Sequence, residues 1–119
     1  MAFPDWTSIA TDFGTTTGKS LELDPDDGPD GWGGCQVSVD QVVKGSFGTT
    51  YRGGNVERLV QLANDLTAAF LGEAVGAGRW PMCPDHGTHP MHAAVDAAHQ
   101  AVWQCPGGRD VANIGELGA

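Results

Sequence analysis

The chain has 119 residues, a length that predicts a single domain, and its 15 acidic residues against six basic ones give a formal charge of −9. This charge repels phosphates and acidic membrane surfaces, and the six basic residues are scattered along the sequence. Composition therefore disfavours nucleic-acid binding and attachment to a membrane.

Cysteine usage and the N-terminal sequence both bear on the compartment. The three cysteines are widely spaced and odd in number, which argues against a disulfide framework and favours a reducing environment. The first residues lack a basic region followed by an apolar run, and no stretch is long enough to span a bilayer. We expect a cytoplasmic protein, or a virion component if a phage encodes it.

The first third of the sequence predicts a short helix followed by a strand. Phe3, Trp6, Ile9 and Phe13 recur at roughly helical spacing within residues 1–18. Residues 19–23 then alternate polar and apolar side chains, as in a half-buried strand. The acidic segment 24–34 has no register with the ligand pattern of a calcium loop, so it is predicted to be a solvated turn.

A β-hairpin and a helix are predicted next. Residues 35–43 and 46–52 have strand patterns, with Lys44-Gly45 as the turn, and Cys35 is expected to be a small buried hydrophobe. From Asn55, the predicted N-cap, to about Val75, apolar residues recur every three or four positions. The fold class expected is α+β: a small antiparallel sheet packed by one main helix over residues 1–78, then a zinc-stapled β-hairpin over residues 79–119. The two parts are expected to form one compact unit.

Soft metal ligands are concentrated near the C-terminus. Cys83 and His86 have the C-x2-H spacing that lets one tight turn present both side chains to one ion. Residues 92–104 can form two short strands around a turn at 96–99, which would return Cys105 to the side of Cys83. On the residues alone the fourth ligand is open among three histidines, of which the one in the predicted turn is disfavoured: His89, His92 and His99. Mixed thiolate and imidazole ligands favour Zn²⁺.

Three segments of the last third of the chain form a pattern: WPMCPDHGTHPM, AVWQCP and IGEL. This pattern gives about residues 80–117 a resemblance to a family of small proteins of unknown function from actinobacteria and their phages. It implies a zinc site whose ligands match four positions of this sequence: Cys83, His86, His89 and Cys105. Met91 stands where the family often has Leu, and the spacing of two residues between His86 and His89 is shorter than in many relatives, which keeps His92 as a substitute.

With all four ligands bound, zinc has no open position for water, and the deaminase and metalloprotease signatures are absent. The sequence therefore favours a non-catalytic zinc-stabilised module for protein interaction, homo-oligomerisation or assembly, with a phage structural component as one setting. Apolar contact area for a partner could come from four residues: Trp80, Met82, Met91 and Trp103. The alternative is that these side chains cover the zinc site and the helix, and it is favoured for Trp80 and Trp103.

Two other functions stay open. The first is a small zinc-dependent hydrolase in which water replaces one histidine and Asp85 or Asp96 serves as base. The second is nucleic-acid binding through the zinc module, which would need Arg52, Arg79 and Arg109 on one face.

Overall fold

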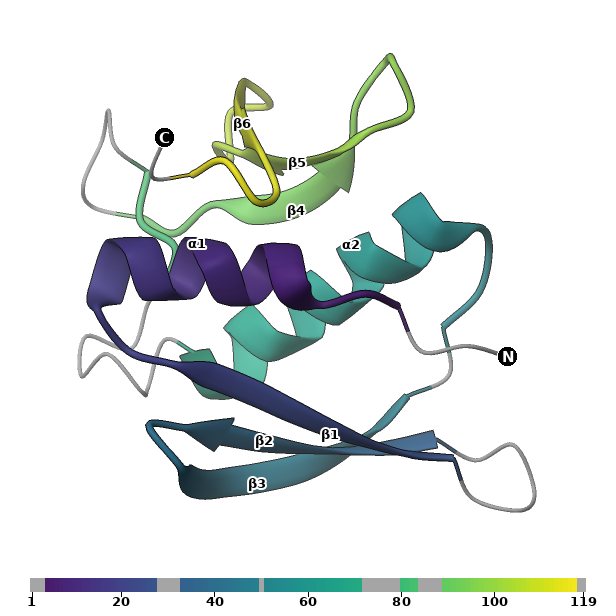
Figure 1. The fold of residues 1–119 in the computed structure, drawn as a ribbon. Helices are drawn as coiled ribbons and strands as arrows, with labels where there is room; N and C mark the ends of the chain where they lie inside the picture. The colour runs from purple at the N-terminus through teal and green to yellow at the C-terminus, as the bar shows by residue number, and fades with distance from the viewer. Residues whose placement is uncertain (1–3, 28–32, 50, 72–79, 84–88, 118–119) are drawn as a thin grey trace.

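The computed structural model describes residues 4–27, 33–49, 51–71, 80–83 and 89–117. Two helices lie between two three-stranded antiparallel sheets (Figure 1), which confirms the α+β class. The first sheet has the order β1-β2-β3 and the second has the order β4-β5-β6. In chain order the elements are α1 (Thr7–Thr17), β1 (Leu21–Asp27), β2 (Gly33–Val39), β3 (Val42–Thr49), α2 (Asn55–Leu66), the π-helical turn η1 (Thr67–Leu71), β4 (His92–Val95), β5 (Ala101–Gln104) and β6 (Asp110–Asn113).

The first sheet forms as expected, but its hairpin turn lies at Asp40 and Gln41 rather than at Lys44-Gly45. Both turn residues have positive φ, the geometry of the two-residue turns that match strand twist. The Asp40 carboxylate stabilises this turn because it accepts the N–H of Ser20 at 2.9 Å and lies 3.7 Å from the Lys19 ammonium. Gly45 instead lies at a β-bulge in β3.

The prediction of a continuous acidic loop over residues 24–34 is wrong at both ends. Strand β1 continues to Asp27, and β2 already begins at Gly33, with Pro25 opposite Cys35. Proline is tolerated here because β1 is an outer strand of the sheet. Residues 28–32, the middle of that segment, lie outside the described residues.

Two helices rather than one pack between the sheets. The predicted N-terminal helix forms as α1, and Ile9 and Phe13 are fully buried. Helix α2 begins at Asn55, but its N-cap is Gly54, whose N–H is accepted by Glu57 Oε1 at 3.1 Å. The predicted continuation of this helix through residues 72–75 lies outside the described part of the chain. No helix among the described residues is long and apolar enough to cross a membrane.

The second sheet is larger than the predicted hairpin because a third strand, β6, pairs with β5. The β4–β5 hairpin itself forms as predicted, with His92 opposite Gln104 and His99 in the turn. Asp96 Oδ1 closes this turn by accepting the backbone N–H groups of Ala98 and Gln100 at 2.9 and 2.8 Å.

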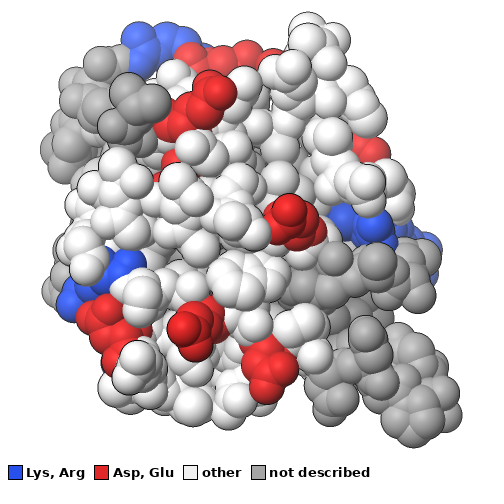
Figure 2. Space-filling model, viewed as in Figure 1, with Lys and Arg blue, Asp and Glu red and all other residues white. Residues whose placement is uncertain are grey.

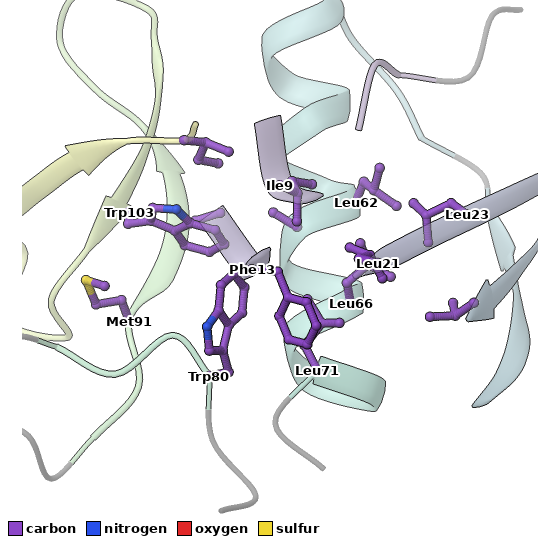
Figure 3. Packing of buried hydrophobic residues seen from close by; sticks show 14 of the residues in the cluster. Ile9, Phe13, Leu21, Leu23, Leu62, Leu66, Leu71, Trp80, Met91 and Trp103 are labelled. Atoms are coloured by element: carbon purple, nitrogen blue, oxygen red, sulfur yellow. The ribbon is translucent and has the colours of Figure 1, made fainter. Parts of the chain in front are cut away.

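One hydrophobic cluster joins both sheets and both helices (Figure 3). Its centre is an aromatic row in which Trp80 lies edge-on to Phe13 and to Trp103, with centroid distances of 5.2 and 5.5 Å. The first sheet contributes alternate residues of its strands, including Val37, which is fully buried. Cys35 is 1% exposed, as expected, and its burial raises the pKa of the thiol to about 11.

Candidate metal site

Cys83 and His89 lie directly opposite each other beside the second sheet. The Cys83 N–H donates to the His89 carbonyl at 3.1 Å, Met82 bridges Pro90, and the Met91 N–H donates to the Pro81 carbonyl. This short ladder adds residues 81–83 alongside the chain leading into β4. Opposite side chains in such a ladder have Cβ atoms about 4.5–5.5 Å apart, a separation that suits two ligands of one ion.

Cys105 lies at the same end of the sheet, immediately after β5. The pairing of His92 with Gln104 places the next residue, Cys105, opposite Met91, one strand from Cys83. Its carbonyl accepts the Gly108 N–H at 2.8 Å and its own N–H donates to the Arg109 carbonyl at 2.9 Å, so a tight turn begins at the cysteine. The sequence prediction that the strands return Cys105 toward Cys83 agrees with this register.

Both cysteines belong to the hydrophobic cluster, with exposed fractions of 1% for Cys83 and 3% for Cys105. Strand alternation places His89 on the face of the sheet that also carries the buried Met91, and the Nδ1 atom of His89 is buried. His92 is exposed and lies on the opposite face of β4. Of these two histidines, His89 is thus the one on the side of the thiols.

The fourth predicted ligand, His86, lies outside the described residues, as does Asp85. Among the residues that are described, no three His, Cys, Asp or Glu side chains gather closely enough to hold a metal ion. Cys83, His89 and Cys105 therefore do not form a metal site by themselves. A site with this donor set requires a further ligand, and His86 is the one that the sequence predicts.

The other residues predicted for function have structural roles. Trp80 and Trp103 are 5% and 0% exposed, in agreement with the covering role favoured for them, and Met91 is 3% exposed, so none of the three offers surface to a partner. Asp96 accepts two backbone N–H groups of its own turn, which leaves it a turn-forming residue. A shallow groove of about 390 Å³ lies along α1 and the start of β1, and none of the predicted ligands lines it.

Two polar residues that the sequence analysis did not single out hold the second sheet in place. Asp12 is 1% exposed, and its carboxylate accepts hydrogen bonds from Trp103 Nε1 at 2.8 Å and from the backbone N–H groups of Gly115 and Leu117 at 2.6 and 2.8 Å. The sequence could have indicated this role, because Asp12 lies between Ile9 and Phe13 on the apolar stripe of α1. A carboxylate buried there without hydrogen-bond partners would be costly.

Asn64 on α2 substitutes for a neighbouring strand. Its side-chain amide donates to the Ala93 carbonyl at 3.0 Å and its Oδ1 accepts the Ala93 N–H at 2.8 Å. A single side chain thus satisfies both backbone groups of Ala93 at the point where the residue 81–83 ladder no longer runs beside β4.

Comparison with known proteins adds no further constraint, since no family model, no curated protein and no solved structure matches the chain. The resemblance of residues 80–117 to small actinobacterial and phage proteins therefore stays a prediction.

Proposed function

We propose that the chain is a non-catalytic module for protein interaction or assembly, whose C-terminal sheet is stabilised by one Zn²⁺ ion held by Cys83, His86, His89 and Cys105. The observation that supports it best is the common position of the thiols. Two cysteines 22 positions apart in sequence lie on the two sides of the segment 89–91 at one end of the second sheet, Cys83 opposite His89 and Cys105 opposite Met91, and both are buried.

Zinc fits this end of the molecule for an energetic reason. Residues 84–90 and 106–109 contain no large apolar side chain and several turn-forming residues, so they have little apolar area to bury. A closed site of two thiolates and two imidazoles would join the segment after Cys83 to the turn after Cys105, and its binding free energy would be added to the free energy of folding. In this proposal the metal shapes a surface and performs no chemistry.

The proposal is tested by measuring metal content in protein purified without a histidine tag. We expect one zinc per chain in the wild type, loss of zinc in Cys105→Ser and His89→Ala, and full retention in His92→Ala. His92→Ala is the matched control, because His92 is a histidine of the same segment on the exposed face of β4.

Thermal unfolding with and without a chelator provides a second readout. The chelator should lower the melting temperature of the wild type and of His92→Ala but not that of Cys105→Ser. If the wild type contains no zinc and its melting temperature is the same with and without the chelator, the proposed site is ruled out.

A further inference from the structure

The outer edge of β1 has backbone groups that point away from its own sheet. Strand β1 is the first strand of the order β1-β2-β3, so one of its edges pairs with no strand among the described residues. The Asp40 N–H donates to the Ser20 carbonyl at 2.9 Å, which directs the backbone groups of Ser20 toward β2. Backbone groups alternate in direction along an antiparallel strand, so those of Leu21 and Leu23 point toward the open edge.

The groove along α1 lies beside this edge. It has a volume of about 390 Å³ and is lined by α1, by the turn after the helix and by the start of β1, including Thr11, Gly14 and Leu21. Helix α1 and strand β1 both lie in front of α2 in Figure 1. A strand added to the β1 edge at Leu21 would therefore have the groove on one of its two faces.

Gly14 lines the groove although alanine would make α1 more stable. A Cβ atom added at Gly14 would have the Lys19 carbonyl oxygen as its nearest neighbour, at 3.5 Å, which is an ordinary van der Waals contact. Alanine therefore fits this position, and alanine stabilises a helix relative to glycine. The packing of α1 does not require the glycine, and the space that its missing Cβ leaves belongs to the groove.

The side chains of β1 indicate what this edge would bind. Four of its seven residues are acidic. Leu21 and Leu23 are buried on the side of the helices, whereas Glu22 and Asp24 are exposed on the other face of the sheet. Acidic side chains follow β1 across the face drawn in Figure 2, and a basic group lies at the start of the strand. A segment with positive side chains is therefore complementary to this edge, and a second copy of the chain, with its charge of −9, is not.

We propose that the β1 edge docks an extended basic segment of a partner protein, which adds a fourth strand to the first sheet along the first half of β1. Side chains of the added strand alternate between its two faces. Those on one face enter the groove beside Gly14, and those on the other lie beside Glu22 and Asp24, where lysine or arginine forms ion pairs. Pro25 has no N–H and interrupts the row of outward donors, so the pairing covers the residues before it.

Binding of a synthetic peptide tests the proposal. The probe is a short peptide in which lysine alternates with valine, and the control peptide has the same composition with the lysines and the valines in two blocks. We expect the alternating peptide to bind, with an affinity that falls as salt screens the ion pairs, and the block peptide to bind at least about tenfold more weakly. Hydrogen exchange measured by NMR should show protection of the Leu21 and Leu23 amides when the alternating peptide binds.

Three substitutions separate docking at β1 from general attraction to a negative surface. Glu22→Lys should weaken binding of the alternating peptide by at least about tenfold. Asp110→Lys makes the same change in charge at an exposed carboxylate on an outer strand of the second sheet, and should leave binding nearly unchanged. Gly14→Ala should weaken binding while it raises the melting temperature, because the added methyl group enters the groove and stabilises α1.

Four results would overturn the proposal: failure of the alternating peptide to bind, equal binding of the two peptides, equal weakening by Glu22→Lys and Asp110→Lys, or a Gly14→Ala variant that binds as tightly as the wild type. The proposal names a partner class for the interaction module proposed above and rests on that function, but it uses none of the predicted zinc ligands. A protein that binds zinc and not the peptide would therefore reject only the docking edge, and one that binds the peptide without zinc would reject only the metal site.

Discussion

The two sheets are attached to the helices between them in different ways. The first sheet packs through alternate apolar residues, of which Leu21, Leu23 and Val37 are buried against the cluster. The second sheet also contributes apolar side chains, but two polar side chains from the helices bind it as well. Asp12 accepts hydrogen bonds from the indole of Trp103 and from two backbone N–H groups of the segment after β6, and Asn64 makes two hydrogen bonds with the backbone of Ala93.

The difference shows how a small sheet with short strands can be positioned. Strands β4, β5 and β6 have four residues each, too few to offer a long apolar face. Hydrogen bonds to buried donors are directional, and a donor left without a partner costs about 1–3 kcal/mol. The second sheet therefore depends on individual polar residues, whereas the first depends on summed apolar area.

The largest effect is expected from Asp12→Ala. The substitution leaves the Trp103 indole N–H and two backbone N–H groups without their acceptor, and we expect it to lower the free energy of unfolding by about 4 kcal/mol. Urea denaturation measures this loss. Trp103 fluorescence should change as well, because its ring nitrogen loses its partner.

Two variants serve as comparisons for Asp12→Ala. Asp5→Ala removes an exposed aspartate that accepts the Thr7 N–H at the start of the same helix, and should cost much less because water replaces this hydrogen bond. Val37→Ala leaves a cavity in the first sheet and should cost about 2–3 kcal/mol. If Asp12→Ala were no more destabilising than Asp5→Ala, the assignment of Asp12 as an anchor of the second sheet would be wrong.

An intermediate effect is expected from Asn64→Ala, which leaves both backbone groups of Ala93 without a side-chain partner. We expect a loss of about 2 kcal/mol in urea denaturation, with faster amide exchange in β4. Asn64→Asp sharpens the test, because its ionised carboxylate can accept the Ala93 N–H but repels the Ala93 carbonyl.

The pH dependence of Asn64→Asp has a definite sign. Only the protonated aspartic acid can donate to the Ala93 carbonyl, so the folded state raises the pKa of this new group above its unfolded value. The stability that it contributes is present in acid and is lost as the pH rises through the folded pKa. An Asn64→Asp variant as stable as the wild type at neutral pH would show that the paired hydrogen bonds contribute little.

The regular elements were predictable from sequence because their patterns are local. Helix α2 and the hairpin of β4 and β5 follow from apolar periodicity and turn residues. The turn at Asp40 and Gln41 was missed because Lys44-Gly45 offers a stronger glycine signal, and the Asp40 carboxylate that stabilises the turn binds the distant Ser20. The extension of β1 through Pro25 depends on pairing with β2, and the residues next to Pro25 in sequence carry no information about that pairing.

The candidate metal site stays a prediction, and only the positions of its described residues can be compared with the sequence. The sequence indicated that two strands between Cys83 and Cys105 would bring Cys105 back toward Cys83. The register of β4 and β5 agrees with this direction of the chain. It could not separate His89 from His92, since that choice depends on which face of β4 each side chain occupies. Asp12 and Asn64 were missed because their partners lie 29 to 105 positions away in sequence.

The smallest effect is expected at the third polar attachment of the second sheet, the contact of 2.7 Å between His99 Nε2 and Glu57 Oε2. It joins the tip of the β4–β5 hairpin to the first turn of α2. Desolvation raises the pKa of Glu57, but the hydrogen bonds with His99 and with the Gly54 N–H outweigh it, so the pKa lies below its ordinary value. Both side chains are partly solvated, which limits what the pair contributes to stability.

Because the pKa of Glu57 is lowered in the folded state, the direction in which its contribution to stability changes with pH is defined. The stabilisation by Glu57 is present above the unfolded pKa and is lost as the pH falls below about 4.3 and through the folded pKa. Urea midpoints measured from neutral to acidic pH should therefore show wild type and Glu57→Gln converging in acid, and His99→Ala should lose part of the same dependence. A constant difference between wild type and Glu57→Gln across this range would mean that the contact does not help to hold the hairpin to α2, leaving Asp12 and Asn64 as its polar anchors.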